Sequence, residues 1–171
     1  MHARWLSAAG ALTAAVAPAA YATQYLSVEQ AQQQAFAQAQ FRELAPPDAA
    51  TAVALGAPAG WAPRIFEART GGTLSGWLIV DQVLGKSELI TYALALDARG
   101  AVGSVEVLDY REAHGGEIRL APWRKQFVGK TAADAVALNK DIRNISGATL
   151  SSTHITEGIK RILATYGGRL K

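Results

Sequence analysis

Large and small or polar side chains alternate most clearly between residues 89 and 97. Over residues 89–97 a large apolar side chain occupies every second position, which is the period of a β-strand. A turn at residues 97–100 (Asp-Ala-Arg-Gly) follows, and residues 102–109 return as the hairpin partner. The pattern predicts two more strands upstream, over residues 63–69 and 76–83. Such closely spaced strands pair antiparallel, because a parallel crossover needs about a dozen residues or more.

The segment before these strands predicts one helix and a connection. Ser27, followed three residues later by Gln30, forms a capping-box pattern, and we expect a helix from this point through about Phe41. Residues 44–60 are rich in Pro, Ala and Gly and have no clear period. We therefore expect an extended connection there.

Helical patterns return after the last strand. Thr131 followed by Asp134 predicts a short helix through Leu138. The final helix carries an apolar stripe, formed by Ile155, Ile159, Ile162, Leu163 and Tyr166. Strands followed by helices predict an α+β fold, in which one antiparallel sheet packs with helices in a single domain.

A run of small residues precedes the final helix: Ser146, Gly147, Ala148 and Thr149, followed by Leu150, Ser151 and Ser152. A helix N-terminus presents unpaired N–H groups and the positive end of the peptide dipole, which together favour a phosphate. Glycine lets the backbone approach closely, the serine and threonine hydroxyls supply donors, and the Thr149 hydroxyl can be esterified. The alternative is an ordinary loop in which these hydroxyls cap the helix.

Two upstream segments contain further candidate residues. The loop 110–117 contains Glu112, His114, Gly115 and Gly116. Two interpretations are open for Glu112 and His114: either they contact a ligand, or they are exposed loop residues without a role. Between this loop and the small-residue run lies Trp-Arg-Lys-Gln-Phe-Val-Gly-Lys, residues 123–130. Trp123 and Phe127 are one helical turn apart, which favours core packing over stacking on a ligand.

These segments together resemble the FMN-binding domain family. Ser146 to Thr149 is similar to its Ser/Thr-Gly-Ala-Thr flavinylation motif, in which the last threonine carries FMN through a phosphoester bond. Arg143 stands where members commonly carry Asp, and Tyr110 where some carry His. The resemblance implies a flavin transferase that uses FAD, a membrane redox partner, and cofactor contacts from the motif and from the upstream loop.

The amino-acid composition excludes several kinds of cofactor. The chain of 171 residues contains no cysteine, which excludes disulfides, iron–sulfur clusters and covalent c-type haem. Electron transfer would then need an organic cofactor. The three histidines lack metal-ligand spacing, so we expect no metal site. The net charge of +3 comes without a basic run interleaved with aromatics, and we expect no nucleic-acid partner.

The N-terminus predicts export. His2 and Arg4 form a cationic start, an Ala-rich uncharged run follows, and Ala20-Tyr21-Ala22 has the form of a cleavage site. We therefore expect a signal peptide at residues 1–22 and a periplasmic or extracytoplasmic protein. An uncleaved membrane anchor is the alternative, so membrane association stays open.

Residues 23–60 then form an N-terminal helix and connection, and residues 61–171 an FMN-binding domain. The favoured function is an exported electron carrier with covalent FMN on Thr149. The alternatives are a flavin-dependent reductase of a small acceptor and a binding module that has lost its flavin. Because no acid–base pair is evident beyond Glu112 and His114, the sequence favours a carrier over a stand-alone enzyme.

Overall fold

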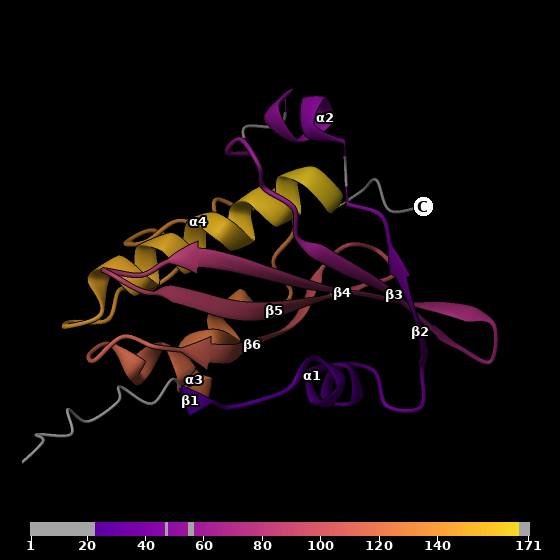
Figure 1. Ribbon diagram of the computed structural model, residues 1–171, viewed down its shortest axis with the longest axis horizontal. Helices are drawn as coiled ribbons and strands as arrows, with labels where there is room; N and C mark the ends of the chain where they lie inside the picture. The colour runs from indigo at the N-terminus through magenta and orange to yellow at the C-terminus, as the bar shows by residue number, and fades with distance from the viewer. Residues whose placement is uncertain (1–22, 47, 55–56, 168–171) are drawn as a thin grey trace, which may run out of the picture.

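Within the described residues, six antiparallel strands form one sheet in the order β1-β6-β5-β4-β3-β2 (Figure 1). The computed structural model describes residues 23–46, 48–54 and 57–167. The strands are β1 (Thr23–Gln24), β2 (Gln40–Leu44), β3 (Arg64–Thr70), β4 (Thr73–Leu84), β5 (Leu89–Asp97) and β6 (Val102–Tyr110). The α-helices are α1 (Val28–Ala35), α2 (Ala49–Ala54), α3 (Ala121–Arg124) and α4 (Thr149–Tyr166), with 3₁₀ turns η1 (Gly116–Arg119) and η2 (Lys125–Phe127). The predicted α+β fold with an antiparallel sheet is confirmed.

The central hairpin of β4 and β5 pairs from Gly76 with Asp97 to Leu84 with Leu89. Residues 89–97 form a strand as predicted, and β4 is longer than the predicted residues 76–83. Most side chains on both faces of β5 are buried. The hairpin thus forms the middle of the core, and its turn at residues 85–88 projects from one end of the sheet.

Helices cover both faces of the sheet, with α4 on one side and α1 on the other (Figure 1). The predicted stripe of α4 is buried in the main core cluster, together with Ile79, Leu94 and Phe127. Ala31 of α1 packs on the opposite face in a smaller cluster with Leu78 and Ala93. Packing of its stripe therefore fixes α4 on the sheet and determines where its N-terminus lies.

Helix α1 begins as predicted but ends early. The capping box is present, because the Ser27 side chain accepts the Gln30 N–H and the Gln30 side chain accepts the Ser27 N–H. The predicted extension to Phe41 is wrong: α1 ends at Ala35, and Gln38 adopts a positive φ of 64°. Phe41 instead pairs with Ala68 as part of β2, which forms an edge of the sheet.

The connection between β2 and β3 is not wholly extended as predicted. Residues Ala49–Ala54 form α2, which lies above α4 in Figure 1. The Asp48 carboxylate accepts the Thr51 N–H at 2.9 Å and the Thr51 hydroxyl at 2.6 Å. This interaction satisfies a donor in the first turn of the helix, and the alanines of the segment have high helix propensity, so the two together account for α2.

The short helix predicted from Thr131 through Leu138 is absent from the described residues. Asp134 accepts the N–H and the hydroxyl of Thr131, as in the start of a helix. The chain then departs from helical geometry, because Val136 has a φ of 41° and its N–H is taken by Asp141. The predicted interaction between Thr131 and Asp134 is therefore present, but it stabilises a turn and not a helix.

A buried carboxylate joins α4 to the sheet. Asp81 of β4 accepts hydrogen bonds from the Tyr92 hydroxyl at 2.9 Å and from the Trp61 indole at 2.8 Å. The Arg161 guanidinium of α4 lies 3.4 Å from the same carboxylate and above the Trp61 ring. These contacts attach α4 and the segment before β3 to the end of β4.

No helix within the described residues is both long enough and apolar enough to cross a bilayer. The predicted signal peptide, and its anchor alternative, lie in residues 1–22, outside the described residues.

Candidate functional site

Helix α4 begins at Thr149, and no side chain among the described residues caps it. Ala148 is the N-cap residue, and the first intrahelical hydrogen bond runs from the Ser152 N–H to the Ala148 carbonyl at 2.9 Å. The amides of residues 149–151 thus precede the hydrogen-bonded part of the helix. The small-residue run therefore does not act as an ordinary side-chain cap, and its helix end is suited to an anion.

The Thr149 side chain is exposed at this helix end. Its hydroxyl oxygen accepts a hydrogen bond from the Asn144 side-chain amide at 3.3 Å. The Asn144 side-chain oxygen accepts the Ile145 N–H at 2.8 Å, which fixes the amide orientation. Asn144 thereby orients the Thr149 hydroxyl while leaving it accessible to solvent.

A partly open cavity of about 610 Å³ lies beside Thr149. This volume falls within the range of about 300–1,000 Å³ that small-molecule sites occupy. Three segments meet around the cavity: the β4–β5 turn, the loop after β6 and the start of α4. The lining residues are Lys86, Ser87, Glu112, Ala113, His114, Gly147, Ala148, Thr149, Leu150 and Ser151.

Seven of the ten predicted site residues line this cavity, namely Glu112, His114, Gly147, Ala148, Thr149, Leu150 and Ser151. The other three, Ser146, Gly115 and Gly116, are not among its lining residues. Gly147 has a φ of 85°, and a Cβ there would meet no described heavy atom within 4 Å. The left-handed turn therefore favours glycine, and it leaves open space beside Thr149.

Gly115 supports the site by close packing. Its φ is 87°, and a Cβ there would lie 2.7 Å from the Tyr110 hydroxyl and 3.2 Å from the Ala148 Cβ. Ala148 is itself buried. The small size of both residues is therefore explained by the close approach of the upstream loop to α4.

Tyr110 connects the same two segments by hydrogen bonds. Its hydroxyl donates to the His114 carbonyl and lies 3.2 Å from the hydroxyl of Ser151, which is buried. Burial raises the pKa of Tyr110, so the hydroxyl stays protonated at neutral pH. The expectation that Ser152 also faces the site is wrong, because its buried hydroxyl donates to the Ala148 carbonyl.

The Glu112 carboxylate is already engaged by the β4–β5 turn. One of its oxygens accepts the Ser87 N–H at 2.6 Å and the Glu88 N–H at 3.0 Å. Partial burial raises the pKa of Glu112, but hydrogen bonds from the amides of residues 88, 87 and 86 outweigh burial and lower it. Glu112 is therefore ionised at neutral pH. Successive backbone amides that converge on one anion form a nest.

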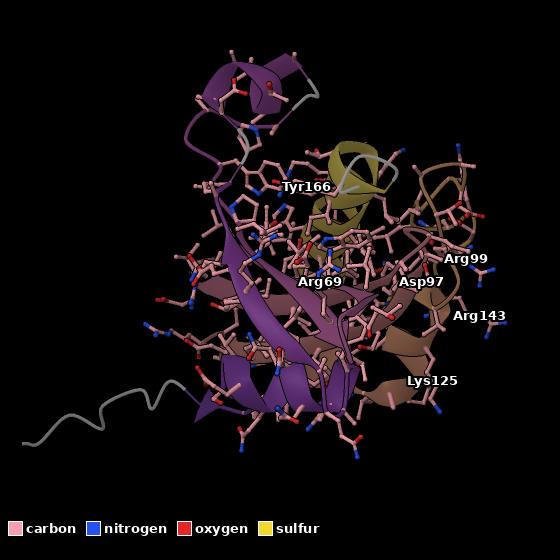
Figure 2. The ribbon with its side chains drawn as sticks, turned by 90° about the vertical axis from the view of Figure 1, so that its right-hand side faces the viewer. Arg69, Asp97, Arg99, Lys125, Arg143 and Tyr166 are labelled. Atoms are coloured by element: carbon pink, nitrogen blue, oxygen red, sulfur yellow. The ribbon has the colours of Figure 1, made fainter. Side chains whose placement is uncertain are left out.

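Lys86 and Ser87 of the β4–β5 turn also line the cavity, although the sequence did not predict them as site residues. A signal was present, since Gly85, Lys86 and Ser87 separate two predicted strands and combine a small flexible residue with a cation and a hydroxyl. Arg143, which occupies the common Asp position of the motif, does not line the cavity. Figure 2 shows its side chain at the outer edge of the domain, directed to solvent.

Trp123 and Phe127 pack in the core, as predicted. Both are buried, and their rings meet edge to face with centroids 5.1 Å apart. The Trp123 indole donates to the Arg143 carbonyl at 2.8 Å. This bond ties the segment before the small-residue run to the core, so Trp123 positions the site without lining it.

Comparison with protein families gives a match between residues 85–164 and the sequence model described as the FMN-binding domain. Every residue that lines the cavity lies inside this range. None of the curated proteins compared matches the chain. The resemblance in the motif, the matched residues and the position of the cavity agree, and residues 85–164 match the FMN-binding domain family.

Proposed function

We propose that this protein is an exported electron carrier that holds FMN through a phosphoester bond to Thr149. One observation carries the proposal: α4 begins without a side-chain cap and presents an exposed Thr149 hydroxyl beside a ligand-sized cavity within the FMN-binding domain.

The residues present fit such a group. A phosphate ester at Thr149 would lie at the positive end of the α4 dipole, next to the amides of residues 149–151. Gly147 leaves space beside the hydroxyl, and Asn144 orients it. The cavity also offers apolar surface from Leu150 and Ala113.

Attachment is a phosphoryl-group transfer without oxidation or reduction. The Thr149 oxygen attacks the phosphorus of the FMN half of FAD, the bond from that phosphorus to the bridging oxygen breaks, and AMP leaves. The hydroxyl proton is released in the same reaction. A flavin transferase in the compartment outside the cytoplasm is the partner that this reaction requires.

Bound FMN supplies one- and two-electron redox chemistry, and the protein orients and tunes it. The Glu112 carboxylate accepts hydrogen bonds from the β4–β5 turn, so it is committed to the fold. This engagement weakens the Glu112–His114 acid–base pair on which a stand-alone reductase would depend. The arrangement therefore favours a carrier over a stand-alone reductase, and we propose a membrane redox protein as the partner with which it exchanges electrons.

The test is co-expression of the full chain with a flavin transferase, followed by denaturing electrophoresis for flavin fluorescence and by intact mass. The wild-type protein is expected to gain one FMN minus one water and to begin at Thr23 after removal of residues 1–22. Thr149→Ala is expected to fold normally and to carry no covalent flavin. Thr153→Ala is the matched control, because its hydroxyl lies one turn further along α4 and donates to the Thr149 carbonyl.

Two results would contradict the attachment: a wild-type chain that stays unmodified, or a Thr149→Ala variant that keeps covalent flavin. A full-length chain recovered from the membrane fraction would instead contradict cleavage and support the anchor alternative.

A further inference from the structure

We infer that Lys86 is the cation that binds the flavin phosphate, and that Glu112 is a positioning residue that holds the turn bearing Lys86 at the cavity. The inference rests on the proposed function and assigns a role to a turn far from the motif in sequence.

Charge balance at the cavity is the first argument. A phosphate ester at Thr149 keeps a negative charge, and the helix end compensates only part of it. Among the described residues that line the cavity, Lys86 supplies the one lysine or arginine. Arg143 is directed elsewhere. Lys86 is exposed, and no described carboxylate lies within ion-pair distance of it, although its charge contributes to the lowered pKa of Glu112. Its ammonium group is therefore accessible to a ligand in the cavity.

The second argument is how the turn is held. A short hairpin turn at the end of a sheet is ordinarily free to move. Here the Glu112 oxygen accepts the N–H groups of Ser87 and Glu88, while the Gly85 N–H bonds the Glu88 carbonyl at 2.7 Å. The carboxylate thus fixes the backbone directly after Lys86 relative to the loop after β6.

Gly85 makes this approach possible. A Cβ at residue 85 would lie 2.5 Å from the Glu112 oxygen, which is closer than real Cβ atoms come to a neighbour. Gly85 is buried, although its turn stands at the end of the sheet. The turn and the loop after β6 are therefore built to fit each other. Under this inference, Glu112 acts on the phosphate through the turn that carries Lys86.

The experiment measures the initial rate of flavinylation by intact mass, with purified transferase and FAD, for folded full-length variants. Lys86→Met is expected to lower the rate about tenfold, the lower end of what a hydrogen bond to a charged group contributes. Lys86→Arg is expected to restore most of the rate, because it keeps the charge. Lys160→Met is the matched control, since Lys160 is an exposed lysine of α4 about 16 Å along the helix from Thr149.

The positioning role of Glu112 is tested by a double-mutant cycle. Glu112→Ala is expected to lower the rate in the wild-type background and to have little further effect when Lys86 is already methionine. Glu112→Gln keeps the acceptor oxygen and is expected to retain most of the rate. A residue that only stabilises the fold would lower the rate equally in both backgrounds, and that result would overturn the positioning role.

The midpoint potential of the loaded protein distinguishes the phosphate from the ring. If Lys86 binds the phosphate, Lys86→Met is expected to keep the potential of the Lys160→Met control. A shifted potential would place Lys86 at the ring, and a rate equal to wild type would remove it from the site. Either result overturns the inference while leaving the attachment to Thr149 intact. A wild-type chain that never accepts flavin would defeat the proposed function itself.

Discussion

Removal of the Asp81 carboxylate is expected to be among the most destabilising single changes away from the cavity. Asp81 is 5% exposed and receives two hydrogen bonds and one ion pair, from Tyr92, Trp61 and Arg161. In Asp81→Ala the fully buried Tyr92 hydroxyl and the Arg161 guanidinium both lose their acceptor. Loss of one partner from a buried ion pair costs about 3–5 kcal/mol. The long 3.4 Å contact to Arg161 favours the lower half of this range.

The cost should depend strongly on Tyr92. Tyr92→Phe alone removes one of three donors to the carboxylate and is expected to cost about 1–2 kcal/mol. In the double variant Asp81→Ala/Tyr92→Phe the Tyr92 hydroxyl is removed together with its acceptor. The combined loss is therefore expected to be smaller than the sum of the single losses by about 1 kcal/mol or more.

The measurement is urea denaturation of each variant at neutral pH, with the free energy of unfolding obtained by linear extrapolation. Glu157→Ala serves as the control, because Glu157 is an exposed carboxylate on α4, and its loss is expected to change stability by about 0.5 kcal/mol or less. A loss below about 1 kcal/mol for Asp81→Ala, or strict additivity with Tyr92→Phe, would refute this account of how α4 is attached to the sheet.

Two further predictions concern the surroundings of the site. Gly115→Ala is expected to lower the free energy of unfolding by about 2 kcal/mol or more, because the added Cβ would contact Tyr110 and residue 115 has a left-handed φ. Gly72→Ala is the comparison, because residue 72 has a φ of 82° but faces open space, so that variant has only the backbone strain. Equal melting temperatures for the two variants would contradict this prediction. The ion pair with Lys130, followed by the N–H groups of residues 137 and 136, lowers the pKa of Asp141 from 3.8 to about 2. Because the folded pKa lies below the unfolded value, this stabilisation is complete above about pH 4 and is lost as pH falls toward 2. Asp141→Asn is expected to flatten the stability profile in that window, and an unchanged acid limb in urea titrations would count against it.

The sequence predicted the elements whose signals are local. Large apolar residues alternate over 89–97, a turn sequence follows, and the structure pairs residues 89–97 with 102–110 as a hairpin. The Ser27–Gln30 capping box also formed, because both partners lie within one helical turn. The position of Thr149 at a helix start followed from the stripe of α4 and the small residues before it.

Two of the wrong predictions, the long first helix and the short helix from Thr131, arise from competing partners that lie outside the predicted helix. Phe41 belongs to a segment with helix-favouring neighbours, but pairing with β3 at the sheet edge prevailed. The Asp141 carboxylate accepts hydrogen bonds from the Val136 and Ala137 N–H groups, so the helical turn that begins with Asp134 does not continue. A local sequence pattern does not specify such partners.

The cavity could be predicted only in part for the same reason. The Ser146–Thr149 run and the loop after β6 each combine glycine with polar residues, and the sequence therefore predicted both as parts of the site. Lys86 enters the cavity because Glu112, 24–25 residues away from Ser87 and Glu88, binds their amides. That contact depends on the packing of the hairpin against the loop, which no spacing in the sequence specifies.

The contact between Glu112 and the β4–β5 turn also limits how this domain can change in evolution or by design. Surface hairpin turns ordinarily tolerate inserted residues at little cost. In this turn, one added residue would displace the amides from a carboxylate that sits 2.6 Å and 3.0 Å from them. A fluorescent tag, an epitope or a linker is therefore better introduced at the β3–β4 turn, where Gly71 and Gly72 face open space.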